Sequence, residues 1–131
     1  MIEQLLAENE GKTIEFKETT RSLGGIMKTV IAFANSAGGI IVIGVKDKTK
    51  ELVGLPRILS EEERLANAIT DSIHPLLTPD IEIQSIRSKE LLIIRVSHGI
   101  GPYYLKAEGS ERGVYVRFWS TNRSVHAEML D

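Results

Sequence analysis

Leu23 to Val45 reads LGGIMKTVIAFANSAGGIIVIGV, and this stretch decides the fold. Its first half repeats apolar residues at the i, i+3, i+4, i+7 spacing of an amphipathic helix. That helix ends at residues 35–39, because glycine adopts the positive φ of a helix C-cap at low steric cost. The second half, residues 40–45, is β-branched and apolar on both faces, which predicts a central strand buried on both sides.

A shorter strand precedes this helix. Residues 13–17 alternate polar and apolar side chains, with Ile14 and Phe16 on one face and Glu15 and Lys17 on the other. The alternation predicts a half-buried strand whose charged face points outward. Residues 2–8 predict a short helix in front of it.

The rest of the chain adds one helix and several strands. A capping box at residues 60–63 opens a helix that extends to residue 73. Further strands are predicted at 81–86, 91–96, 102–105 and 113–117. Strand hairpins mixed with only two substantial helices predict an α+β fold, a mixed, largely antiparallel sheet with helices packed on it.

No repeat or linker divides the sequence, so residues 1–131 are predicted to form a single domain. Residues 122–130 predict the opening of a helix. A domain that stops inside a helix suggests the N-terminal fragment of a longer regulator, and we state this as an expectation.

The composition excludes several classes of protein. The 131 residues contain 16 basic and 18 acidic side chains, a net charge of −2, so the chain does not coat nucleic acid by bulk charge. With no cysteine it has no disulfide, no thiolate metal site and no cysteine nucleophile. It has neither a signal-peptide pattern nor an apolar run long enough to span a membrane. We therefore expect a cytoplasmic protein with no membrane partner.

Four segments in order carry a resemblance to a known family. They read EGKTIEFK at 10–17, AFANSAGG at 32–39, IGVKD at 43–47 with VG at 53–54, and GVYVR at 113–117 with STNR at 120–123. Over residues 10–124 the chain resembles the Schlafen AlbA-like domain, once labelled a divergent AAA ATPase. One departure is visible: Phe118 and Trp119 precede Ser120, where the family usually has a small residue, often glycine.

The resemblance implies two roles. In prokaryotes the family is described as a DNA-binding module at the front of transcriptional regulators. In animal Schlafens, related domains carry three acidic residues that bind a divalent metal and cut structured RNA. Those acids match Glu10, Glu15 and Asp47, so the resemblance implies these three as the metal-binding and catalytic residues of a nuclease.

The chemistry of the three acids leaves alternatives open. If the strands at 13–17 and 40–45 are neighbours, Glu10, Glu15 and Asp47 converge at one end of the sheet. Their hard oxygen ligands suit Mg²⁺ or Mn²⁺, which can orient a phosphodiester and activate water. The same acids can instead form a solvated acidic edge, with Glu15 and Lys17 as a surface pair, or orient basic residues for binding only.

Basic and aromatic side chains provide the second candidate site. A local basic patch can bind phosphates even though the net charge is near zero. The candidates for this patch are Lys17, Arg21, Lys28, Arg117 and Arg123, with Lys106 and Arg112 in the same third of the sequence as the last two. Aromatic candidates for stacking on an unpaired base are Tyr103, Tyr104, Tyr115 and Trp119, which are otherwise expected in the core.

The leading hypothesis is a nucleic-acid-binding, specifically DNA-binding, module of a transcriptional regulator, with Lys17, Arg117 and Arg123 on phosphates. A divalent-metal-dependent nuclease acting on RNA or DNA is the alternative. A third reading is a protein interaction module, with a homodimer as one form.

Overall fold

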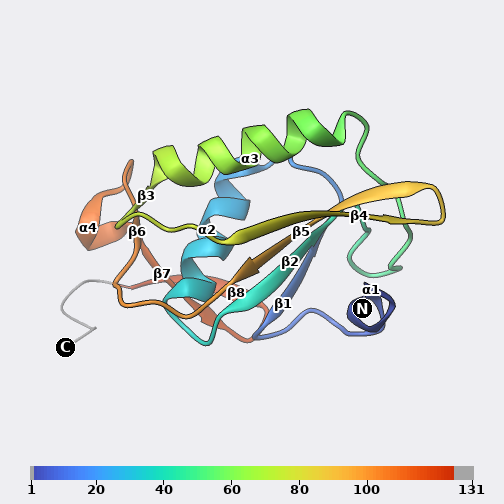
Figure 1. Cartoon of the computed structure of the whole chain (residues 1–131). Coiled ribbons are helices and arrows are strands. Elements are labelled where there is room, and N and C mark those ends of the chain that lie inside the picture. Colours follow the sequence, from blue (N-terminus) through green and yellow to red (C-terminus); the bar gives the residue numbers. More distant parts are fainter. Residues whose placement is uncertain (1, 126–131) are drawn as a thin grey trace.

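The computed structural model describes residues 2–125 and shows an α+β fold, as predicted (Figure 1). The helices are α1 (Ile2–Leu6), α2 (Leu23–Ala34), α3 (Ile58–Ser72) and α4 (Gly109–Arg112). The strands are β1 (Ile14–Lys17), β2 (Gly39–Ile43), β3 (Ile73–His74), β4 (Asp80–Ile86), β5 (Lys89–Val96), β6 (Tyr104–Leu105), β7 (Val114–Phe118) and β8 (Thr121–Val125).

The first sheet is mixed, with the strand order β1-β2-β5-β4. β1 and β2 are parallel, and the other neighbours are antiparallel. The register places Glu15 beside Ile41 and Lys17 beside Ile43. β2 lies inside the sheet with Ile41, Val42 and Ile43 fully buried, so the predicted central strand and its β1 neighbour are confirmed.

The two faces of this sheet are covered differently. Side chains such as Ile41 and Leu92 pack with α2 and α3 into the main core. The opposite face, which carries Phe16 and Val42, forms a smaller cluster with Ile2 of α1. Figure 1 shows the long α3 along one side and the short α1 on the other.

The remaining strands form a second sheet, antiparallel throughout, with the order β3-β6-β7-β8. We expected one sheet, and the reason for two is α2. Eight of its twelve residues are buried, including every residue from Thr29 to Ala34. A helix with most of its residues apolar and buried needs cover on more than one side. The first sheet covers one side of α2, and β7 and β8 pack against another.

Asn35, the C-cap of α2, joins the helix to the second sheet. Its Nδ2 donates to the carbonyl oxygens of Tyr103 and Tyr115, both at 2.9 Å, and its Oδ1 accepts from the Tyr103 N–H at 2.8 Å. The turn then needs glycine at Gly38, where φ is +78° and a Cβ would lie 2.7 Å from the Val96 carbonyl oxygen. The predicted end of this helix is confirmed.

Two predictions about the helices are also wrong. Residues 121–125 form β8 and not the opening of a helix, because they pair along their whole length with β7, Asn122 opposite Arg117. Residues 126–130 of that prediction lie outside the described residues. The capping box at Ser60 does not open α3, which begins at Ile58 after Arg57 without a side-chain cap. Ile58 is buried in the core, so packing starts the helix two residues earlier.

None of the helices within residues 2–125 has both the length and the apolar character needed to cross a membrane.

The hydrogen bonds of Asn35 give a test of how α2 is joined to the second sheet. Asn35→Ala removes three of them, and we expect it to lower the free energy of unfolding by about 1–3 kcal/mol, since the backbone groups of Tyr103 and Tyr115 lose partners. Urea denaturation measures this loss. Asn67→Ala, on the exposed side of α3, is the control, with an expected change within about 0.5 kcal/mol. If the two substitutions lower the free energy of unfolding equally, Asn35 does not join α2 to the second sheet.

Candidate functional site

Glu15 differs most from its predicted environment. The sequence places it on an outward, solvated face, but in the structure only 5% of its surface is exposed. The reason is the second sheet, which lies over the face of β1 that Glu15 occupies. The carboxylate is paired with Arg117, whose Nη1 lies 2.7 Å from Oε1. The Arg117 side chain is 0% exposed, so both charges of this pair are buried.

Glu15 and Arg117 belong to a closed ring of four polar side chains. Arg117 Nη1 also donates to Asn122 Oδ1 at 2.8 Å. Asn122 Nδ2 donates to Thr29 Oγ1 at 2.8 Å, and Thr29 Oγ1 donates to Glu15 Oε2 at 3.0 Å. The ring joins β1, α2 and the β7–β8 hairpin, and we call it the Arg117 ring.

The other donors of Arg117 are directed to the backbone before and within β1. Nε and Nη2 donate to the carbonyl oxygen of Gly11 at 3.0 and 2.9 Å, and Nη2 also donates to that of Ile14 at 3.4 Å. The guanidinium lies over the Phe33 ring, 4.9 Å from its centroid. This placement differs from the predicted phosphate contact, because no face of the guanidinium is open to solvent.

Glu10 lies in the turn before β1 and is half-buried. Its Oε2 accepts the N–H of Phe16 at 3.0 Å. Burial raises the pKa of the Glu10 carboxyl above its ordinary value of 4.5; the Phe16 N–H and the Arg117 charge oppose the rise, while the charges of Glu15 and Asp47 add to it. Glu15 and Asp47 therefore both lie close enough to Glu10 to act on its carboxyl.

Asp47 is exposed, but Glu15 is committed to protein partners. Both oxygens of Glu15 accept from side chains, Oε1 from Arg117 and Oε2 from Thr29, and Lys17 Nζ lies 3.3 Å from Oε2. Within residues 2–125 no group of three carboxylate or histidine side chains is arranged to hold a metal ion. The residues as placed do not fit Mg²⁺ or Mn²⁺, because an ion would have to displace the hydrogen bonds of Glu15.

The predicted cations other than Arg117 have different surroundings. Lys17 is half-buried beside Glu15, and Arg21 is exposed just before α2. Lys28 lies over the Tyr115 ring with Nζ 5.3 Å from its centroid, and the Arg123 guanidinium lies 5.0 Å from that of Phe118. No carboxylate of the described chain lies within ion-pair distance of Arg21, Lys28 or Arg123.

The aromatic residues separate into core and surface. Tyr103 and Tyr115 are buried, as the core-packing alternative predicts. Burial and a hydrogen bond to the Glu108 carboxylate raise the pKa of Tyr115 to about 12. Tyr104 is half-buried and packs on His74, their ring centroids 5.3 Å apart. Trp119 alone among the four is largely exposed.

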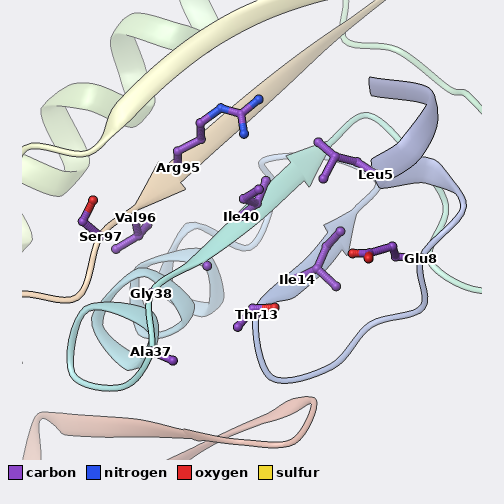
Figure 2. A pocket seen from close by; sticks show the side chains of 11 residues that line it. Leu5, Glu8, Thr13, Ile14, Ala37, Gly38, Ile40, Arg95, Val96 and Ser97 are labelled. Atoms are coloured by element: carbon purple, nitrogen blue, oxygen red, sulfur yellow. The ribbon is translucent and has the colours of Figure 1, made fainter. Parts of the chain in front are cut away.

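A surface pocket of about 320 Å³ lies where β1 and β2 begin and β5 ends (Figure 2). Figure 2 shows Thr13, Gly38, Arg95 and Ser97 around it. Arg95 Nη2 is already paired with Glu82 at 2.9 Å, which leaves no unpaired cation in the lining for an anionic ligand. We assign no ligand to this pocket.

Sequence reasoning missed the structural roles of Thr29, Asn122 and Ser36. Thr29 had a signal, because it is a polar residue directly before the apolar run of residues 30–34. Ser36 Oγ accepts the Arg117 N–H at 3.0 Å. Both Ser36 and Asn122 belong to the segments that carry the family resemblance. In this structure those segments supply the hydrogen bonds that join the two sheets.

The Arg117 ring leads to a stability prediction. Arg117→Met leaves the Glu15 carboxylate buried without its counter-ion, and we expect a loss of about 3–5 kcal/mol in the free energy of unfolding. Arg95→Met is the matched control, because the Arg95–Glu82 pair is 44% and 41% exposed and is worth about 0–1 kcal/mol. Urea denaturation compares the two variants. A loss below about 1 kcal/mol for Arg117→Met would contradict the assignment.

The raised pKa of Glu10 predicts how its contribution depends on pH. Because the folded state favours the protonated acid, ionisation of Glu10 opposes folding. The loss of folding stability begins as the pH rises through 4.5, the ordinary pKa of the carboxyl in the unfolded chain. It is complete above the raised pKa of the folded state. Glu10→Gln keeps an acceptor for the Phe16 N–H, so we expect it to be more stable than wild type near neutral pH.

The difference in stability should disappear below about pH 4, where the wild-type carboxyl is protonated in both states. Thermal melting of the two proteins across this range measures it. Glu3→Gln, on the exposed surface of α1, is the control. A constant difference at every pH would show that charge is not its cause.

Comparisons with known proteins agree on the fold. The chain is similar to the N-terminal domain of a protein from Nitrosomonas europaea that is related to the ATP-dependent DNA helicase RecG. The TM-score is 0.69 at 29% identity, over 93% of this chain and 88% of that one. It is also similar to the DIP2311 protein of Corynebacterium diphtheriae, with a TM-score of 0.68 at 20% identity, over 95% of this chain and 25% of that one, which shows the fold alone.

Sequence comparison gives a relative and a family. The protein UU034 of Ureaplasma parvum serovar 3, named an uncharacterized ATP-binding protein, is 34% identical over 89 residues. The match covers 65% of this chain and 25% of that protein, so the chain spans about a quarter of this relative. The family model "Schlafen, AlbA_2" matches residues 10–126. With nearly its whole length matched, the chain belongs to the Schlafen AlbA_2 family.

Proposed function

We propose that this domain binds nucleic acid through the surface of its β7–β8 hairpin, as a DNA-binding module of a transcriptional regulator. The observation that carries the proposal is the surroundings of two cations, Lys28 of α2, which packs against this hairpin, and Arg123 of β8. Lys28 and Arg123 hold their charges over the rings of Tyr115 and Phe118, with no described carboxylate in ion-pair range. Unpaired cations held on a rigid surface are suited to phosphate contacts.

Other features support the same surface. Arg21, also without a carboxylate partner, lies just before α2, the helix that carries Lys28 and packs against β7 and β8. Two partly exposed cations that pair with acids lie away from the hairpin: Arg95 pairs with Glu82, and Lys46 pairs with Glu51. The relation of the Nitrosomonas europaea protein to a DNA helicase is consistent with a nucleic-acid partner.

We do not propose that the domain hydrolyses nucleic acid. A metal-dependent nuclease built on Glu10, Glu15 and Asp47 needs free carboxylate oxygens, and those of Glu15 accept from Arg117 and Thr29. Self-association through the same hairpin is a separate hypothesis that sedimentation tests directly.

Salt dependence of binding tests the proposal. Each phosphate contact contributes about −0.9 to the slope of log affinity against log salt for duplex DNA. Lys28→Gln with Arg123→Gln should therefore make the slope shallower by about 1.8, measured by fluorescence anisotropy of a labelled duplex.

The control is Lys46→Gln with Arg95→Gln, which removes the same charge from two cations that are already paired. We expect its slope to match that of wild type. Equal slopes for the two double variants, or no binding at low ionic strength, would reject the proposal.

A further inference from the structure

The turn of the β7–β8 hairpin places a tryptophan where the backbone favours glycine. Phe118 pairs with Thr121, so Trp119 and Ser120 form a two-residue turn. Trp119 has φ of +58° at the first of these two positions. A type II′ hairpin turn takes glycine there, because a side chain at positive φ collides with the backbone. A bulky residue at this position strains the fold.

Burial does not compensate for this strain. The Trp119 side chain is 74% exposed, and its neighbour Phe118 is 53% exposed. Two adjacent large aromatic residues in solvent contribute little to stability through the hydrophobic effect. A strained backbone combined with exposed aromatic rings points to a role outside folding.

The surroundings of the tip define the chemistry of its ligand. Arg123 lies on the Phe118 ring, so a positive charge accompanies the aromatic surface. An aromatic face beside a guanidinium matches a nucleotide, whose base stacks while its phosphate pairs with the cation. In a duplex the faces of the bases are covered by their neighbours, so stacking requires an unpaired base.

We infer that the hairpin tip, Phe118 and Trp119, stacks on an unpaired base, so that the nucleic acid recognised is single-stranded or contains an unpaired segment. The inference rests on the proposed function and specifies its ligand. Arg123, which lies over the Phe118 ring, then contacts the phosphate next to the stacked base.

Trp119 is the only tryptophan in the chain, so its fluorescence reports directly on the tip. The experiment titrates the protein with oligodeoxythymidylate, with oligouridylate and with a DNA duplex, each of about 12 nucleotides per strand. We expect single strands to bind more tightly than the duplex and to quench the emission. The two single-stranded arms show whether DNA or RNA is preferred.

Substitutions at residue 119 separate binding from folding. Trp119→Gly relieves the strain and removes the ring, so we expect a higher melting temperature together with roughly 5- to 100-fold weaker binding of a labelled single strand. Trp119→Phe keeps a stacking face and should retain most of the affinity. Ile100→Gly removes an apolar side chain that is 94% exposed elsewhere and should leave binding unchanged.

The outcomes distinguish this inference from the proposed function. If both single strands and duplex bind equally without quenching, the inference is wrong while the proposed function stands. If no nucleic acid binds at low salt, both are wrong. If Trp119→Gly leaves single-strand affinity unchanged, or instead abolishes self-association seen by sedimentation, the tip is not a base-stacking site.

Discussion

The buried ion pair between Glu15 and Arg117 is the constraint on which the rest of the structure depends. Removing two charges from water is costly, and the attraction between them compensates only when their other hydrogen bonds are also made. The Thr29 hydroxyl donates to Glu15. Arg117 donates to the Asn122 side chain and to the backbone carbonyl of Gly11. The pair therefore has one arrangement in which all partners are satisfied. That arrangement sets how β1, α2 and the β7–β8 hairpin lie against one another.

This constraint separates the structural cations from those available to a ligand. Arg117 is occupied on every side, whereas Lys28 and Arg123 lie on aromatic rings near the surface. An aromatic ring beneath a cation holds it in place but leaves its charge intact, whereas a carboxylate partner would neutralise that charge. The hairpin thus has an inner face, with Tyr115 and Arg117, that completes the fold, and an outer face where Arg123 and Phe118 leave charge and aromatic surface exposed.

Much of the fold was predictable, because segments in which apolar residues recur at regular spacing form the expected helices and strands. The spacing of α2 and the apolar run of β2 were recognised correctly, and the β4–β5 hairpin followed from its alternation. The environment of Glu15 was not predictable from β1 alone, since the residue that covers it lies 102 positions later. The polar run of β8 predicts a helix instead of a strand for the same reason: Asn122 faces inward toward a partner in α2 that local sequence does not reveal.

The distance between Glu15 and Arg117 along the chain has a consequence for synthesis. β1 is an edge strand, with β2 as its only neighbour in the first sheet, and its carboxylate cannot enter a dry interior before the guanidinium arrives. β1 is synthesised before the segment that carries Arg117, 102 positions later, and must wait for it. Chains truncated before Arg117 should therefore leave this strand undocked, although the central helix and its neighbouring strands are already complete.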